Sequence, residues 1–388
     1  MTNTTSKIGL TTATIIGMNA MIGAGIFTVP AALQWQAGPA GILTFAFVIL
    51  AVWCMALSLA RVAQLYPGEG SFYNYTKQWG GHYLGLLASG AYIIGLTVAL
   101  GLLTKIVGGY IHDIIPAMGS TLWGVIMLII IVLLNLRGVM LLQFLQYVLI
   151  ACKILPLILI TILCATKASS AHLFPFMPNG IMPVLLATKT VVFGFFGFEA
   201  AASLYNVVKN PEQNVPRAIS YSTALVGIIY FLFTLAIIMA VPRTMVTSAS
   251  QPLSELLLQL FPEYGWLVML TAIAIICAIL GTLHAMIWAT SSLVISFTKA
   301  IAPQYTASQT IAVLIIGTGT LLCDLFLHNI DLFFSLTALG VVFAYTTSML
   351  TLLIKHKEKP REKIITITGL LAAGIIFVCA IDGIIKSL

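Results

Sequence analysis

The chain has 388 residues, of which 60% are hydrophobic and 7% are charged, and its formal net charge is +7 at pH 7. Soluble globular domains carry charge on about a quarter of their residues. The composition therefore excludes an ordinary soluble protein and indicates an integral membrane protein.

Apolar stretches of about 20 residues recur along the chain, which is the length that a helix needs to cross a hydrocarbon core about 30 Å thick. They lack the strict alternation of apolar and polar residues of a membrane β-strand, so we expect an all-α fold. The sequence predicts about 11 membrane segments, at residues 8–32, 40–63, 82–111, 121–136, 142–165, 183–208, 217–240, 264–290, 308–328, 331–354 and 364–385. No stretch remains for a soluble domain, which favours transport across the bilayer over catalysis.

The first segment contains the stretch MIGAGIF at residues 21–27, in which Gly23 and Gly25 interrupt an apolar run. Segment 6 contains a second interruption, FGFFGFEAA at residues 193–201, with two further glycines. A single glycine pair in a membrane helix often serves close helix packing. Two such pairs, at the openings of two successive groups of five segments, instead indicate two broken helices.

Because five is odd, the second group of segments enters the membrane from the side opposite to the first, which is the inverted-topology repeat of secondary transporters. We therefore expect a first repeat at residues 1–165, a second repeat at residues 183–354, and a basic cytoplasmic loop with a peripheral eleventh segment at residues 355–388. In this architecture the substrate site lies near the bilayer midplane, at the interface of the repeats.

A helix that is broken within lipid exposes N–H and C=O groups, each of which costs several kcal/mol unless a cavity or a ligand satisfies it. The N-terminus of the half-helix after the break carries a partial positive charge that suits a carboxylate. The carbonyl ends of the opposing half-helices suit an ammonium group. A zwitterionic amino acid presents both groups, and glycine lets it reach the backbone without a Cβ atom in the way.

The basic residues are unevenly distributed between the two ends of the predicted segments. If the N-terminus is cytoplasmic, the loops on that side contain Lys7, Arg61, Lys77, Arg137, Lys209, Arg217, Lys299, Lys355, Lys357, Lys359, Arg361 and Lys363. The loops on the other side contain Lys167, Arg243 and Lys386. Basic residues gather in cytoplasmic loops, so we predict a cytoplasmic N-terminus and attribute the basic excess to topology rather than to nucleic-acid binding.

Lys153 lies near the middle of segment 5, eleven residues from Leu142 and twelve from Ala165. Inserting a lysine at such a depth costs about 2.5–3.5 kcal/mol, so an ionisable residue there is by default a functional candidate. Pro156 leaves the carbonyl of Cys152 without its helical partner. The alternative to a coupling role is a structural tether, in which the ammonium group bonds to the carbonyls of a broken helix.

Glu199 is the carboxylate that the predicted segments place near the midplane, and His284 lies within segment 8. Each has a structural alternative, since a buried carboxylate can join two helices and a lone histidine often completes a core. The six cysteines form no CxxC pair or metal-ligand spacing, and the sequence has no HExxH or GxSxG motif. We therefore expect no metal, no cofactor and no enzymatic activity.

Three stretches resemble the amino acid, polyamine and organocation (APC) superfamily of permeases: MIGAGIFTVPAAL at residues 21–33, YPGEGSFYNY at 66–75 and VKNPEQNVPRAI at 208–219. They occur in the family's order and at compatible spacing. The resemblance implies a LeuT-like fold with five-plus-five inverted repeats and alternating-access transport of amino acids. The family usually has twelve segments where this sequence shows eleven, which leaves open whether the protein is a monomer or a homodimer.

The resemblance also implies roles for individual residues. The substrate-binding positions that it implies are Ile22, Gly23, Ala24, Gly25 and Ile26 in the first break, Phe193, Phe196 and Gly197 in the second, and Met286. In several sodium-independent members a lysine on segment 5 occupies the place where sodium-coupled relatives bind a cation, and Lys153 resembles it. At the position of Glu199, related arginine and agmatine exchangers have a glutamate that acts as a gate and senses protons.

The identity of the substrate stays open at this point. Phe193, Phe196 and Met286 favour a neutral, hydrophobic amino acid, whereas Glu199 leaves room for a cationic one such as arginine or lysine. Amino acid exchange and proton-coupled uptake are both compatible with the sequence, and sodium-coupled symport is the nearest rival. The expected partners are the amino acid, protons and the lipid bilayer. The resemblance to bacterial permeases implies the plasma membrane, which is the inner membrane of a bacterium.

Overall fold

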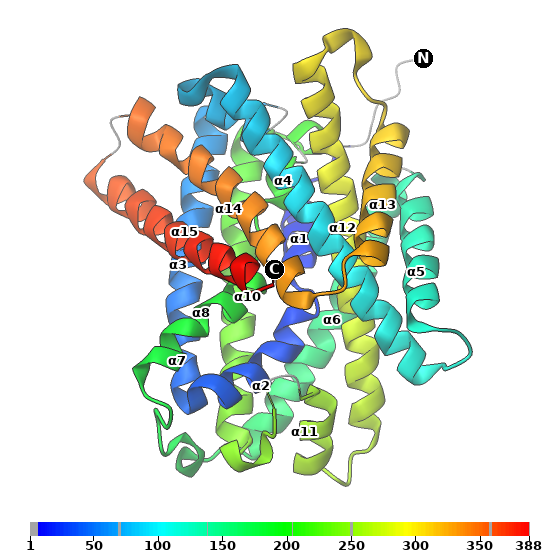
Figure 1. The fold of residues 1–388 in the computed structure, drawn as a ribbon, viewed down its shortest axis with the longest axis vertical. Coiled ribbons are helices and arrows are strands. Elements are labelled where there is room, and N and C mark those ends of the chain that lie inside the picture. Colours follow the sequence, from blue (N-terminus) through cyan, green and yellow to red (C-terminus); the bar gives the residue numbers. More distant parts are fainter. Residues whose placement is uncertain are drawn as a thin grey trace.

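The structure is a computed structural model that describes residues 7–68, 71–137, 139–203, 205–248, 251–356 and 359–387. These residues form a bundle of helices (Figure 1). The α-helices are α1 (Leu10–Met21), α2 (Gly25–Ala37), α3 (Gly41–Leu65), α4 (Ser71–Ile114), α5 (Ser120–Asn135), α6 (Val139–Thr166), α7 (Ile181–Leu186), α8 (Thr188–Phe193), α9 (Ala200–Ser203), α10 (Pro211–Ala240), α11 (Leu253–Leu260), α12 (Trp266–Ile301), α13 (Gln309–Phe326), α14 (Ile330–Lys355) and α15 (Pro360–Ser387).

Each of the predicted segments is helical, which confirms the all-α prediction. Among the described residues, eight helical stretches are long and apolar enough to cross a membrane, and one of them runs from α2 into α3. Helix α5 is apolar but shorter, with 16 residues. The first segment is divided into α1 and α2, and the sixth into α7, α8 and α9, so both predicted interruptions are present.

The structure differs from the prediction at two places. Helix α4 includes a helical stretch at residues 71–80 that was not predicted. Gly81, with a non-helical φ angle of 76° that residues with a side chain rarely adopt, forms a kink between this stretch and the helix that begins at residue 82 as predicted. The short helix α11 was not predicted as a separate element. Its apolar face buries Leu253, Leu256 and Leu257, and its eight residues are too few to cross a bilayer.

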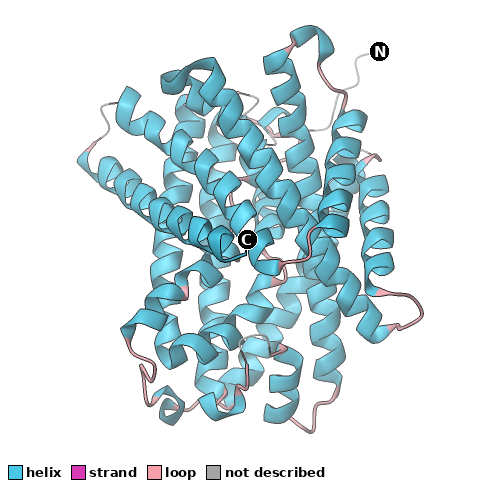
Figure 2. Cartoon of the chain, viewed as in Figure 1, coloured by secondary structure: helices cyan, strands magenta, loops and turns pink. Residues whose placement is uncertain are grey.

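The distribution of side chains is that of a protein embedded in lipid. Large apolar residues such as Ile94, Phe144 and Leu155 are exposed on the outer surface of the bundle, while Lys153 and Glu199 are buried inside it. Loops lie mainly at the ends of the helices (Figure 2). A chain that exposes apolar side chains and buries charges satisfies its polar groups within the bundle, as the hydrocarbon region of a membrane requires.

The packing of the helices places the two interrupted segments inside the bundle. Helix α1 packs against α6, α10 and α12, and α9 packs against α1, α10 and α12. Helix α14 lies along α4, and α15 packs on α14 and α3 (Figure 1). An isolated bridge joins the residues before α1 to those after α9, with the Ile8 N–H group donating to the Val207 carbonyl at 2.7 Å.

Candidate functional site

The first helix break leaves the carbonyl end of α1 inside the protein. Helix α1 ends at Met21, and α2 begins at Gly25. The last four carbonyls of an α-helix have no partner within the helix. One of them is satisfied from α10, since the buried Tyr230 hydroxyl donates to the Met21 carbonyl at 3.1 Å. The broken end is therefore fixed to a neighbouring helix by a side chain.

Lys153 of α6 binds the same broken end. Its side chain is fully buried, and the ammonium Nζ donates to the carbonyls of Ile22 at 2.7 Å, Asn19 at 3.2 Å and Ala278 at 3.4 Å. A buried charge is costly unless it is hydrogen-bonded. These three carbonyls, from α1 and α12, supply the bonds that let the ammonium group lie at this depth.

Two residues of α12 complete this arrangement. The Thr282 hydroxyl lies 2.9 Å from the Asn19 carbonyl and 3.1 Å from the Ile22 carbonyl. At Gly281, a Cβ atom would lie 2.8 Å from the Lys153 Nζ atom, so only glycine leaves space for the ammonium group at this position. Three carbonyl oxygens therefore converge on the lysine Nζ atom, and the Thr282 hydroxyl donates to two of the same carbonyls.

The second break lies between α8 and α9, at residues 194–199. Gly197 has a φ angle of 105°, and a Cβ atom on it would lie 2.9 Å from the Ala20 carbonyl oxygen of α1. A Cβ atom on Gly25 would lie 3.3 Å from the Cα atom of Gly194. The glycines thus allow the backbones of the two broken segments to approach each other closely.

Glu199 is held by two tyrosines from other helices. Its carboxylate accepts hydrogen bonds from the hydroxyls of Tyr92 on α4 and Tyr345 on α14. The carboxylate and both hydroxyls are buried, and the Phe72 ring lies against Tyr92, with the ring centroids 4.3 Å apart. Bonds from neutral donors to a carboxylate are stronger than bonds between two neutral groups. This cluster ties the second break to α4 and α14.

A cavity of about 50 Å³ lies between the two breaks. It is lined by Ala20, Met21, Gly23, Ala24, Gly25, Leu96, Ala99, Leu100, Leu103, Gly194, Phe196, Thr282 and Met286. One water molecule needs about 10–15 Å³ by this measure, so the cavity has room for only a few small groups in this conformation.

The structure brings together most of the predicted substrate-binding residues. Five of the predicted positions line the cavity: Gly23, Ala24, Gly25, Phe196 and Met286. Ile22 and Ile26 are buried beside it, and Ile22 offers its carbonyl to Lys153. Gly197 contacts α1 instead of the cavity. Phe193 ends α8, and its side chain lies outside the described residues.

The other predicted polar residues lie around the cavity and do not line it. The Lys153 Nζ atom bonds to the Ile22 carbonyl behind the cavity wall, and Glu199 lies at the end of the second break. Neither is among the residues that line the cavity. His284 is buried, and its Nδ1 atom lies 2.9 Å from the Gln146 side-chain nitrogen on α6. The ring therefore packs towards α6.

Sequence reasoning missed several residues of the site. Thr282 lies one helical turn before Met286, so the spacing of four residues was a signal that both share a face of α12. The small residues of α4 around Ala99 were a second signal, since small side chains leave space between helices. Nothing in the sequence pattern marked Tyr92 and Tyr345. Among the described residues, no group of three or more His, Cys, Asp or Glu side chains could hold a metal ion.

The family model of amino acid permeases matches residues 8–385 of this sequence. The chain belongs to the amino acid permease family. The match covers both breaks, the cavity and all of the helices up to the last turn of α15. The family that the sequence motifs resemble is thus confirmed by a comparison that covers nearly the whole chain.

Individual relatives support the same assignment. An uncharacterised transporter of Mycobacterium tuberculosis is 28% identical over 283 residues, which are 72% of this chain and 63% of the relative. The branched-chain amino acid permease BcaP of Bacillus subtilis is 27% identical over 65% of this chain and 58% of its own length. The aromatic amino acid transport protein AroP of Escherichia coli is 24% identical over 61% of this chain and 55% of its own length. The alignments thus span less than two thirds of these relatives.

Solved structures share the fold of this family member. A Na⁺-coupled sialic acid symporter superposes with a TM-score of 0.67, at 12% identity, over 98% of this chain and 90% of the symporter. MhsT in complex with L-phenylalanine gives a TM-score of 0.65 at 14% identity, over 95% of this chain and 98% of MhsT. At such identities the likeness concerns the fold alone, which is the LeuT-like inverted-repeat fold with broken first and sixth segments.

Proposed function

We propose that this protein is a sodium-independent amino acid transporter that works by alternating access in the plasma membrane, with its N-terminus in the cytoplasm. Its substrate is a neutral, hydrophobic amino acid, which it exchanges for another amino acid or takes up together with a proton. The names of its relatives BcaP and AroP, a branched-chain permease and an aromatic amino acid transporter, support this class of substrate.

The observation that carries the proposal is the position of the Lys153 ammonium group. Carbonyl oxygens and a hydroxyl are hard ligands of the kind that bind small cations. Here the carbonyls of Ile22, Asn19 and Ala278 converge on Nζ instead. A sodium ion at this point would have to displace the ammonium group or lie against its positive charge. Sodium independence follows from that conflict.

The two breaks supply groups for the common part of an amino acid. The N-terminus of α2, at Gly25, carries a partial positive charge that favours the substrate carboxylate. The first N–H groups of a helix have no partner within it, and the glycines of the cavity wall leave the backbone accessible. The substrate ammonium group binds backbone carbonyls exposed at the breaks. This division leaves the side chain to face Phe196 and Met286.

The cavity wall favours a neutral side chain over a cationic one. None of the described residues that line it is charged, and the lining side chains are mainly Leu, Ala, Met and Phe. Glu199 is the carboxylate that a cationic substrate would need, but Tyr92 and Tyr345 already hold it. A cationic amino acid exchanger of the arginine or lysine type is therefore the second candidate, and it requires the glutamate to leave its tyrosine partners during transport.

The test is counterflow into proteoliposomes that contain the purified protein. Each common amino acid is loaded inside at high concentration, and the entry of the labelled form is measured with sodium or choline outside, with and without a pH gradient. The proposal predicts that neutral, hydrophobic amino acids exchange equally well in choline. Accumulation that needs a pH gradient identifies proton coupling. If arginine or lysine alone exchanges, the cationic alternative replaces the proposal. If no amino acid exchanges, the proposal that the protein transports amino acids is wrong.

A further inference from the structure

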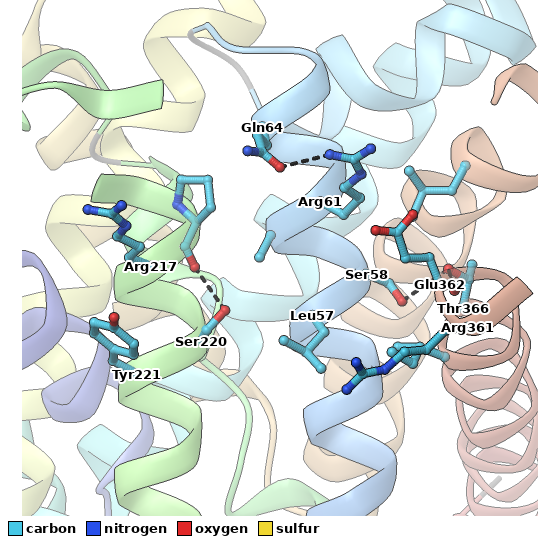
Figure 3. Close-up of a pocket in the computed structure, with 14 residues that line it drawn as sticks. Leu57, Ser58, Arg61, Gln64, Arg217, Ser220, Tyr221, Arg361, Glu362 and Thr366 are labelled. Carbon is cyan, nitrogen blue, oxygen red and sulfur yellow. Dashed lines mark hydrogen bonds between the residues drawn. The ribbon is translucent and has the colours of Figure 1, made fainter. Parts of the chain in front are cut away.

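A second cavity, of about 460 Å³, lies far from the helix breaks, between the C-terminal part of α3, the N-terminal part of α10 and the beginning of α15 (Figure 3). These ends belong to the side of the bundle on which most of the basic residues gather. Its volume lies within the range of about 300–1,000 Å³ that is typical of small-molecule sites. Exposed residues on its rim, among them Arg217, Tyr221 and Arg361, leave it open to the surroundings.

The lining of this cavity is positively charged. It contains three arginines, one from each of the three helices, and one glutamate, Glu362. Arg61 of α3 donates to the Gln64 side chain at 2.9 Å, which fixes its position (Figure 3). The Arg361 side chain extends from α15 towards α3 (Figure 3). An arginine fork is suited to phosphate oxygens, to which it can donate two parallel hydrogen bonds.

The faces of α10 and α3 that line the cavity continue towards the middle of each helix as apolar surface. On α10, Leu225, Ile228 and Leu232 continue the face of Tyr221 at intervals of three or four residues, and all three are about half exposed, at 46%, 59% and 51%. Residues at this spacing lie above one another on a helix surface. The face therefore runs from a cationic rim, through an aromatic ring, to a long apolar stripe.

Helix α3 shows the same sequence of surfaces. Arg61 and Leu57 line the cavity, and Trp53, Leu50 and Phe47 follow further into the membrane, with exposed fractions of 42%, 59% and 51%. Tryptophan and tyrosine side chains are enriched at the level of the lipid headgroups. The arginines thus lie where the phosphate of a lipid lies, and the apolar stripes lie where its acyl chains lie.

We propose that this cavity is a binding site for the phosphate-bearing headgroup of an anionic membrane phospholipid, whose acyl chains lie along the apolar faces of α3 and α10. The combination of an arginine-lined cavity and two apolar stripes distinguishes a lipid from a soluble phosphate, which would use only the cavity. A basic pocket between membrane helices is a recognised form of lipid headgroup site. The bound lipid links α15 to α3 and α10. The site is independent of the proposed transport activity.

The experiment is a lipid titration of the purified full-length protein, measured by native mass spectrometry in the absence of amino acids. Dioleoyl phosphatidylglycerol and dioleoyl phosphatidylcholine are compared, because they share acyl chains and differ in charge. We expect the wild-type protein to bind phosphatidylglycerol about ten-fold more tightly. The double variant Arg217→Gln/Arg361→Gln should lose this preference and bind phosphatidylcholine as before. Both arginines are exposed, so their replacement leaves the packing of the helices intact.

The matched control is Lys209→Gln/Lys363→Gln, which removes the same charge from exposed residues outside the cavity, at the same side of the bundle. It should keep the preference within about two-fold. Equal losses in both double variants would show a general surface charge and overturn the proposal, as would a preference that survives in the arginine variant. A further arm adds inorganic phosphate at the concentration of the lipid. If phosphate at this concentration displaces the lipid, the acyl chains add nothing to binding, the cavity is a site for free phosphate and the lipid proposal is overturned.

Discussion

The two helix breaks are linked to neighbouring helices by side chains of opposite kinds, a basic one and an acidic one. At the first break a cation, the Lys153 ammonium group, donates to the carbonyls that α1 leaves exposed. At the second break an anion, the Glu199 carboxylate, accepts from the hydroxyls of Tyr92 and Tyr345. The partners come from different helices: α6, α10 and α12 bind the first break, and α4 and α14 bind the second.

This difference separates two tasks. We propose that the lysine at the first break, where carbonyl oxygens converge, determines which ion the protein can use. In the same proposal the glutamate, through its link to α4 and α14, determines how the second broken segment moves with those helices. The cavity between the breaks has no charged side chain among its described lining residues and is left for the substrate. The following variants test this division, beginning with the largest expected effect.

Replacement of Lys153 by alanine should nearly abolish transport. It removes the hydrogen bonds from the ammonium group to the Ile22 and Asn19 carbonyls, and a bond to a charged group contributes about 1.5–3 kcal/mol. We expect a loss of about 100-fold or more in initial counterflow rate. Lys363→Ala, on the exposed surface, is the control and should retain full activity. Wild-type rates in Lys153→Ala, with or without sodium, would show that the lysine is a dispensable tether.

Replacement of Gly197 by alanine should reduce both stability and transport. Its φ angle of 105° and the 2.9 Å approach of a Cβ atom to the Ala20 carbonyl make any side chain strained. Strain of this kind costs about 1–3 kcal/mol, so the apparent melting temperature should fall by several degrees and the counterflow rate by roughly ten-fold. Gly374→Ala in α15, where a Cβ atom meets nothing within 4 Å, should change neither. Equal behaviour of the two variants would contradict the close approach of the breaks.

Replacement of Tyr345 by phenylalanine should weaken the link between the second break and α14. It leaves the Glu199 carboxylate with its bond from Tyr92 and removes a charge-assisted hydrogen bond worth about 1.5–3 kcal/mol. We expect a lower melting temperature and a loss of about three- to ten-fold in transport rate. A double-mutant cycle with Glu199→Gln measures the coupling. Additive losses would mean that the two side chains do not act together.

Replacement of Met286 by alanine should have the smallest effect and change selectivity more than rate. The thioether side chain lines the cavity, so its removal makes room for larger substrates. We expect the ratio of KM values for phenylalanine and alanine to fall by about three-fold, since a few methylene groups in an apolar pocket change discrimination by about 1–3 kcal/mol at most. Met269→Ala, which is 49% exposed on the same helix, should leave the ratio unchanged. An unchanged ratio in both variants would place the substrate side chain elsewhere.

The first break and its lysine could be predicted from sequence because their signals are local. Gly23 and Gly25 lie within a single apolar segment, and Lys153 is a charge in the middle of another, so each stands out without knowledge of its partners. The structural alternative for Lys153, an ammonium group bonded to the carbonyls of a broken helix, describes the contact that the structure shows with Ile22.

The hydrogen bonds from Tyr92 and Tyr345 to Glu199 at the second break could not be predicted in the same way. Tyr92 and Tyr345 lie 107 and 146 residues from Glu199 along the chain, and a tyrosine in a membrane helix is not unusual by itself. Their role depends on contacts of α4 and α14 with the second break, which no pattern in one sequence specifies. The helical stretch at residues 71–80 was likewise not predicted, although the kink at Gly81 lies where the predicted segment begins.

The most direct test of the central claim is counterflow of labelled leucine into proteoliposomes in which choline replaces all sodium. The claim is that a lysine ammonium group occupies the place of a coupling cation at the first break, between α1, α6 and α12. It predicts the same initial rate and the same accumulation of leucine in choline and in sodium. Accumulation that appears only when sodium is present would contradict it.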